Sequence, residues 1–218
     1  MGAAAPEQGP RWGTLSQERA SRFVVAWGFG ATEEASAPKA VVQTRARTRD
    51  RRGTCWISDG SGSYEKWIRK TYSDPMRRGR PGRPKRELVR GTGLTQLIKT
   101  RKNGRIVHVR IRHCFGPEAS SAHTVHVERR NGVLRDRLNC LSRRTHGFAK
   151  RVRTWDAVVS LSLFEENWMR PHVALRIRKD DLPDGRRYEQ RSPAMAVGLA
   201  THVWSWCEFL TRSVHQCW

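Results

Sequence analysis

The chain has 218 residues, enough for one domain, or one domain with a small appendage, to bury a core without disulfides. Its 42 Lys and Arg residues outnumber 20 Asp and Glu residues, and the resulting net charge of +22 indicates an acidic partner. Hydrophobic residues make up 37% of the chain and nine residues are Trp, a composition that excludes full disorder.

Neither a membrane span nor a secretory signal is visible, so we expect no membrane partner. The five cysteines are widely spaced without a C-x-x-C pair, which favours reduced thiols in a cytosol-like compartment. A zinc site formed by Cys207, His215 and Cys217 would lack a fourth ligand at the usual spacing, so incidental thiols are the better interpretation.

The first half of the chain predicts alternating strands and helices. The apolar run at 22–29 predicts a central strand, buried on both faces. Thr32 is expected to cap a helix that continues to about Thr48. A short strand over 54–58 ends at Asp59, where a carboxylate would lie at the transition from strand to loop.

Helical spacing of aromatic residues predicts a short helix over 64–72. The basic segment 76–90 contains Pro and Gly that argue against regular structure and predict an exposed loop. Strands over 96–100 and 105–112 should then form a hairpin around Asn103-Gly104. Alternation in the second strand predicts one face that packs and one cationic face.

The second half of the chain predicts two amphipathic helices, over 127–141 and 154–168. Glu128 lies in the first turn of the former helix. A charged, turn-rich stretch over 179–191 precedes a C-terminal element that Trp204 and Trp206 should dock.

Several motifs occur together in order: WISDG at 56–60, GRPGRPK at 79–85, the hairpin LIKTRKNGRIVHVRIR, VERRNGVLRDRL, and NWMRPHVALR at 167–176. The series resembles the insertion-sequence-one family of bacterial and archaeal transposases. The resemblance extends from about Arg11 to Phe209. It implies an RNase-H-like α/β fold with a mixed sheet, flanking helices and an inserted basic loop and hairpin.

The resemblance also implies an active site of two Asp and one Glu that hold divalent metal, Mg²⁺ or Mn²⁺. Asp59 in the S-D-G motif and Glu128 in E-R-x-N match the second Asp and the Glu, and are the catalytic and metal-binding candidates. Two Mg²⁺ ions held by carboxylates can activate the attacking oxygen and stabilise the leaving oxygen in strand transfer. No match to the family's first Asp is found, so we expect a chain that is incomplete at its N-terminus and inactive alone. Glu18 and Asp50 are weaker substitutes.

The resemblance makes DNA the partner, as transposon ends and target. A homo-oligomeric state is left open. The basic loop also resembles an AT-hook, which reads the minor groove, but sequence-independent phosphate contact is the favoured role. The DNA-binding candidates are Arg77, Arg78, Arg80, Arg83, Lys85, Arg86, Arg110, Arg112, Arg129, Asn131 and Arg135.

The domain prediction is a poorly ordered start at 1–10, a catalytic domain at 11–176 with its basic insertion at 76–112, and a docking segment at 177–218. The predicted function is that of an insertion-sequence DNA transposase, cytoplasmic and nucleoid-associated in a prokaryote. The alternative is a non-enzymatic basic protein that binds nucleic acid. In that case Asp59 is a turn residue and Glu128 a helix-dipole partner.

Overall fold

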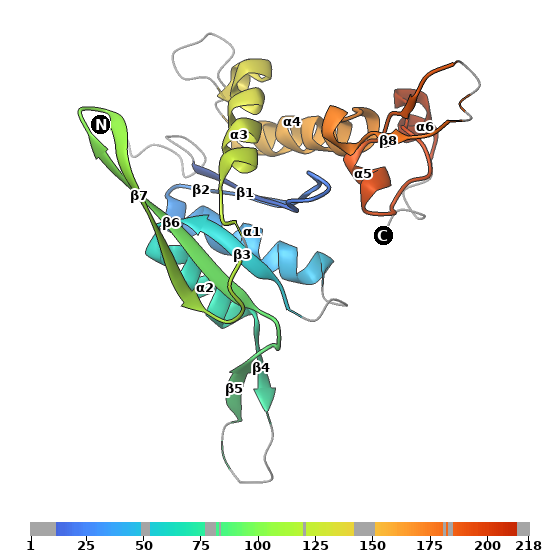
Figure 1. Cartoon of the computed structure of the whole chain (residues 1–218). Coiled ribbons are helices and arrows are strands. Elements are labelled where there is room, and N and C mark those ends of the chain that lie inside the picture. The colour runs from blue at the N-terminus through green and yellow to red at the C-terminus, as the bar shows by residue number, and fades with distance from the viewer. Residues whose placement is uncertain are drawn as a thin grey trace. The chain divides into compact units, whose positions relative to one another are not determined.

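The computed structural model describes residues 12–48, 53–76, 82, 84–119, 121–141, 151–180, 182 and 185–212. In this part of the chain, six α-helices and nine strands confirm the predicted α/β class (Figure 1). The strands form four small sheets. The described residues divide into a central unit, made of 12–16 and 25–131, and a C-terminal unit, made of 17–24 and 132–212.

The main sheet of the central unit has three strands in the order β3-β6-β7. β3 is parallel to β6, and β6 is antiparallel to β7, so the sheet is mixed. Asp59, the last residue of β3, pairs with Leu97 in the middle of β6. The bounds of the three strands are β3 (Cys55–Asp59), β6 (Gly93–Lys102) and β7 (Arg105–Phe115).

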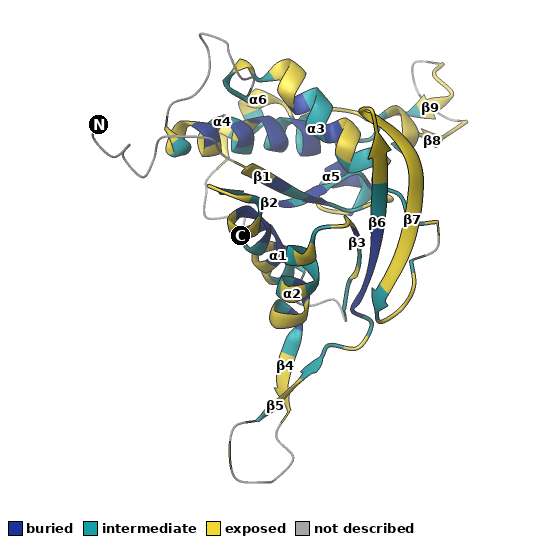
Figure 2. Cartoon of the chain, turned by 90° about the vertical axis from the view of Figure 1, so that its left-hand side faces the viewer, coloured by how far each residue is buried: buried dark blue, intermediate teal, exposed yellow. Residues whose placement is uncertain are grey.

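Two helices of the central unit pack against this sheet, α1 (Glu33–Arg47) and α2 (Gly62–Thr71). The Thr32 side chain accepts a hydrogen bond from the Ala35 amide, which confirms the predicted N-cap. Both helices and β6 contribute to one buried cluster, formed by Val41, Ile68, Tyr72 and Leu94. Figure 2 shows the first half of β6 buried, beside the exposed β7.

The predicted hairpin between β6 and β7 is confirmed, with Asn103 and Gly104 both at positive φ. Val109 and Ile111 lie opposite Lys99 and Leu97 and therefore on the other face from Arg110 and Arg112, as alternation predicts. The expectation that this apolar face packs is wrong, because Ile111 is 56% exposed and Val109 is 45% exposed. Alternation indicates which residues share a face, but not whether another element covers it.

Regular structure also occurs where the sequence predicts an exposed basic loop. β4 (Ser73–Met76) and β5 (Lys85–Leu88) form an antiparallel pair. Pro75 is tolerated because β4 has no described neighbour on its outer edge. The prediction is therefore wrong for 85–88, whereas residues 77–81 and 83 lie outside the described residues.

The strand predicted at 22–29 is β2 (Val24–Gly30), which pairs with β1 (Trp12–Gln17). Among the described residues this sheet has two strands, so β2 is not the central strand that its apolar run predicted. Val24, Ala26 and Gly28 alternate with half-buried residues. One face of β2 is fully buried and the other is half-buried, which accounts for the apolar composition of this strand.

The helices of the second half are α3 (Val125–Arg137), α4 (Val152–Phe164), α5 (Pro193–Ala196) and α6 (Trp206–Thr211). α3 and α4 confirm the two predicted amphipathic helices, and α4 continues through a π-helical turn to Met169. In the C-terminal unit, Trp155, Val159 and Leu163 bury one side of α4. Two short strands, β8 (Ile177–Arg178) and β9 (Tyr188–Glu189), pair between α4 and α5 along the chain.

An aromatic cluster holds the end of the C-terminal unit. The ring of Trp168 lies 4.7 Å from that of Trp204, and Phe164 stacks on Trp168 at 5.6 Å. Trp204 is buried, as predicted for a docking residue. Trp206, the first residue of α6, is 42% exposed, and its ring lies 5.8 Å from that of Phe209. In the described ranges no helix has the length and apolarity needed to cross a bilayer.

Candidate functional site

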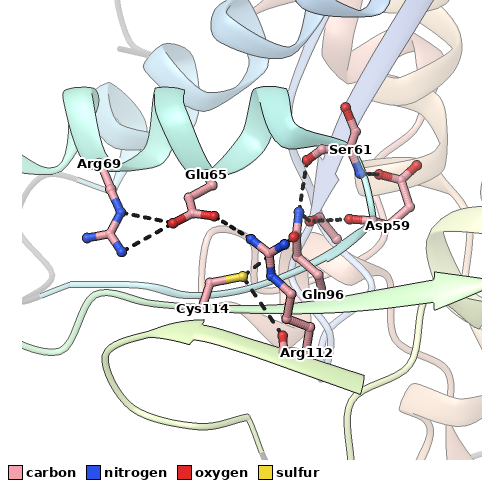
Figure 3. Close-up of polar contacts among 8 residues, drawn as sticks. Asp59, Ser61, Glu65, Arg69, Gln96, Arg112 and Cys114 are labelled. Carbon is pink, nitrogen blue, oxygen red and sulfur yellow. Dashed lines mark hydrogen bonds and ion pairs between the residues drawn. The ribbon is translucent and has the colours of Figure 1, made fainter. Parts of the chain in front are cut away.

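Asp59 lies at the carboxyl end of β3, where the chain turns into α2. Its carboxylate accepts a hydrogen bond from the Ser61 amide at 3.3 Å, and the residue is exposed. The Ser61 carbonyl in turn accepts a bond of 2.8 Å from the buried side chain of Gln96 on β6 (Figure 3). The loop that carries Asp59 is therefore fixed to the sheet while its carboxylate faces solvent.

Two further titratable groups of the central unit, Glu33 and Tyr64, interact with the charge of Asp59. Partial burial raises the pKa of Glu33, and the charge of Asp59 raises it further, while a hydrogen bond from Ser61 lowers it. Burial also raises the pKa of Tyr64 to about 12, with Asp59 as the second cause. The sequence alone does not indicate this interaction, since the proximity of Glu33 to Asp59 follows from the packing of α1 beside α2.

Glu128 lies in the first turn of α3, where its carboxylate is engaged by two neighbours. The Lys99 ammonium on β6 donates to it in an ion pair, and the Thr124 hydroxyl donates at 2.5 Å. The hydrogen bond from Lys99 is the main reason that the pKa of Glu128 is lowered. The side chain of Lys99 is mostly buried, so its charge is screened less than that of a surface lysine.

The two predicted carboxylates lie near the same end of the β3-β6 pair. Asp59 is in register with Leu97, and the residue that contacts Glu128 is two positions further along β6. The groups that contact the Glu128 carboxylate are Lys99 and Thr124, and Asp59 is not among them. Within the ranges that the structure describes, no group of three or more His, Cys, Asp or Glu side chains could hold a metal ion.

The cationic face of β7 lies beside this region. Arg112 donates to Glu65 of α2 at 2.7 Å, and Glu65 also accepts from Arg69 at 3.3 Å (Figure 3). Arg110 is exposed and lies opposite Ile98, and no described carboxylate forms an ion pair with it. Of the two predicted DNA-binding arginines on β7, one is therefore partly neutralised and the other is open to a partner.

The remaining DNA-binding candidates are scattered. Lys85 and Arg86 are exposed on β5, where Arg86 also donates to the Ser73 carbonyl. The candidates on α3 are two exposed arginines and one half-buried asparagine, namely Arg129, Arg135 and Asn131. Those that lie outside the described residues are Arg77, Arg78, Arg80 and Arg83.

Arg130 of α3 is buried, although it is one of the charged residues of an amphipathic helix. A one-dimensional pattern cannot distinguish an arginine on the solvent side from one that extends along the boundary of a packed face. The exposed cations of α3 are therefore fewer than its sequence indicates.

Comparison with known proteins adds no relative. No family model matches the chain, and no curated protein and no solved structure matches it either.

Proposed function

We propose that this chain is a DNA-binding protein of the insertion-sequence transposase type, with an RNase-H-like core. The order of elements supports this proposal. The hairpin of β1 and β2 is followed by α1, by β3 with Asp59 at its end, by α2, and later by β6, which is parallel to β3. Carboxylates at the end of β3 and at the start of α3 stand where the resemblance implies catalytic residues.

One observation carries the DNA-binding part of the proposal. Residues 99–113 include six Lys and Arg residues and no Asp or Glu, and residues 100–113 are all exposed. Lys99 and Arg112 are paired with Glu128 and Glu65, whereas Arg101, Lys102, Arg105 and Arg110 form no ion pair with a described carboxylate. Such a concentration of positive charge is unfavourable by itself and becomes favourable against a polyanion, since phosphate contacts release condensed counterions. The net charge of +22 extends the same attraction to the chain as a whole.

The metal part of the proposal meets an obstacle in the side chains. Mg²⁺ or Mn²⁺ would be bound by hard oxygen ligands such as Asp59 and Glu128. The Glu128 carboxylate is instead paired with Lys99, and the described residues provide no group of three ligands. These residues do not fit a metal-binding site as they stand, and we expect the chain alone to bind DNA without cleaving it.

The second candidate is a non-enzymatic basic protein that binds nucleic acid. The ion pair between Lys99 and Glu128 favours it, because a lysine that neutralises the carboxylate also competes with a metal ion for it. The partner of the first candidate is DNA, as transposon ends and target, and the partner of the second is DNA or RNA. Both also place the protein in a prokaryotic cytoplasm, associated with the nucleoid.

The experiment uses the full chain with duplex DNA that carries the flanking genomic sequence, in Mg²⁺, Mn²⁺ or EDTA. We compare Asp59→Ala and Glu128→Ala with two matched controls. Asp136→Ala removes an exposed carboxylate of α3, and Glu34→Ala removes an exposed carboxylate from the first turn of α1.

Metal-dependent strand transfer that is lost in both site variants and kept in both controls would establish the enzyme. Salt-sensitive binding that persists in EDTA, without cleavage in any variant, would establish the non-enzymatic candidate. Failure to bind either DNA or RNA at low salt would contradict both.

A further inference from the structure

The hairpin of β6 and β7 extends beyond the rest of its sheet. β3 pairs with β6 only as far as Leu97, whereas β6 continues to Lys102 and returns through β7. We call residues 98–110 the ribbon. The ribbon has two strands and no described third strand, and everything from Thr100 onward is exposed (Figure 2). Such a ribbon can enter a space that a full sheet cannot.

Charge is concentrated at the end of the ribbon. Lys102 and Arg105 lie directly opposite each other beside the turn, and Arg101 is the next residue on β6. Like charges opposite each other destabilise a β-ribbon, and no described carboxylate forms an ion pair with any of these three residues. Only the charge of Arg101 acts on a described carboxylate from a distance, since it helps to lower the pKa of Glu128. A polyanionic partner would remove this repulsion.

Apolar side chains occupy the returning strand of the ribbon. Ile106 is 47% exposed, Val107 58% and Val109 45%. Single exposed apolar residues are common, but Ile106 and Val109 lie opposite Arg101 and Lys99 and therefore share one face, where they form an apolar strip beside these cations. Val107 lies between them and has no partner on β6, because the register shifts there. The strip indicates that the partner presents apolar groups next to its negative charges.

We propose that the ribbon binds in the major groove of double-stranded DNA. In this arrangement Arg101, Lys102 and Arg105 contact phosphates and base edges, and Ile106 and Val109 contact thymine methyl groups. The inference deepens the proposed function and depends on its DNA-binding part. Two strands about 4.8 Å apart, with their side chains, match a groove about 12 Å wide.

Other occupants fit less well. Single-stranded nucleic acid is bound largely by aromatic stacking, and residues 98–110 include no Phe, Tyr or Trp. Duplex RNA has a deep, narrow major groove that side chains cannot read. A second copy of the ribbon would bring like charges together. Duplex DNA provides phosphates for the cations of the ribbon and thymine methyl groups for its exposed apolar side chains.

The first test measures equilibrium binding of the full chain to duplex DNA in EDTA, as a function of salt. The ribbon variant is Arg101→Ala, Lys102→Ala and Arg105→Ala combined. The control removes three exposed basic residues of the central unit outside the ribbon, Lys39→Ala, Lys66→Ala and Arg90→Ala. We expect the slope of log affinity against log salt to fall by about 0.9 for each phosphate that is no longer neutralised, or about 2.7 in the ribbon variant.

The second test identifies the groove. Replacing thymine by uracil removes only a methyl group that lies in the major groove. We expect the unmodified protein to bind uracil DNA several-fold more weakly than thymine DNA. The variant Ile106→Ser with Val109→Ser removes the side-chain methyl groups from this face and should lose this discrimination. Circular dichroism of both variants checks that the fold is retained.

The outcomes separate this inference from the proposed function. No binding of any duplex would contradict the DNA-binding function itself. Duplex binding with equal slopes for the ribbon variant and its control would overturn the ribbon inference alone. Equal affinity for thymine and uracil DNA, tighter binding to RNA or single strands, or ribbon-dependent dimerisation would overturn it as well.

Discussion

Lys99 on β6 donates to the carboxylate of Glu128 on α3 and ties the start of that helix to the sheet. Thr124, whose carbonyl accepts the hydrogen bond of the Glu128 amide, adds its hydroxyl to the same carboxylate. The sequence motif E-R-x-N therefore begins in a fixed position. The ammonium that fixes it is supplied by a strand 29 residues earlier in the chain.

Replacing Lys99 should remove the positive charge that stabilises the ionised carboxylate of Glu128. In Lys99→Gln we expect the pKa of Glu128 to rise toward its usual value of 4.5, because the largest cause of its lowering is removed. A lowered folded-state pKa contributes stability above pH 4.5 that is lost as the pH falls through the folded pKa. The free energy of unfolding of the variant should be lower by about 0.5 kcal/mol near neutral pH. The loss is small because Glu128 is half exposed and solvent screens its charge.

Carboxylate carbon shifts of Glu128 followed by NMR against pH measure this change. Lys102→Gln, at an exposed position of the same strand, is the control. An unchanged Glu128 titration in Lys99→Gln would show that the ion pair does not form in solution.

Alkaline pH should destabilise the central unit through Tyr64. Burial raises the pKa of Tyr64 from 10.0 to about 12, so the folded state holds its proton longer than the unfolded state. This contribution is fully present below pH 10 and is lost as the pH rises through about 12. Tyr64→Phe should abolish the highest phenolate step in ultraviolet absorbance and flatten the loss of stability over that range. Tyr188→Phe, at an exposed site, serves for comparison, and equal titration curves for the two variants would refute the assignment.

Asn167 should be a structural residue of the N-W-M-R-P-H motif. Its side chain accepts from the Val24 amide at 2.9 Å and donates to the Val24 carbonyl at 3.0 Å, and it is buried. Asn167→Ala leaves both backbone groups without these partners and should cost about 2–4 kcal/mol. Urea unfolding measures the loss, and Gln190→Ala, at an exposed position, should stay within about 0.5 kcal/mol of the unmodified protein. Equal midpoints for the two variants would contradict this role.

Gly116 should be irreplaceable at the end of β7. Its φ is +71°, and an added Cβ would overlap the carbonyl oxygen of Thr92. Gly116→Ala should cost about 2–4 kcal/mol, the sum of backbone strain and overpacking. Gly104→Ala has the same kind of φ, +77°, but open space around it, and should cost only about 1 kcal/mol. Thermal unfolding separates the two, and a smaller loss in Gly116→Ala than in Gly104→Ala would disprove the steric argument.

Local signals predicted the local structure well. The Thr32 cap, the Asn103-Gly104 turn and the position of Glu128 in a first helical turn each depend on neighbouring residues, and each is confirmed. The position of Asp59 at the end of a strand follows from the same kind of signal.

Contacts made by the tertiary structure could not be predicted in this way. The pairing of Lys99 with Glu128 depends on how α3 lies along β6, which no residue spacing encodes. The proximity of Glu33 to Asp59 depends on the packing of α1 beside α2. The exposure of Val109 depends on the absence of a covering element among the described residues. The residues of a candidate site can therefore be predicted from the sequence, whereas the groups that surround them become known only from the fold.

β7 is also the outer strand of its sheet in the described structure, eleven residues long and without proline. Such an edge exposes unpaired backbone groups and invites pairing with strands of other molecules. Arg110 and Arg112, which alternate with the exposed β-branched residues, place positive charge along this edge. Two such edges repel each other, so the same arginines that attract a polyanion keep the protein from aggregating through its longest strand.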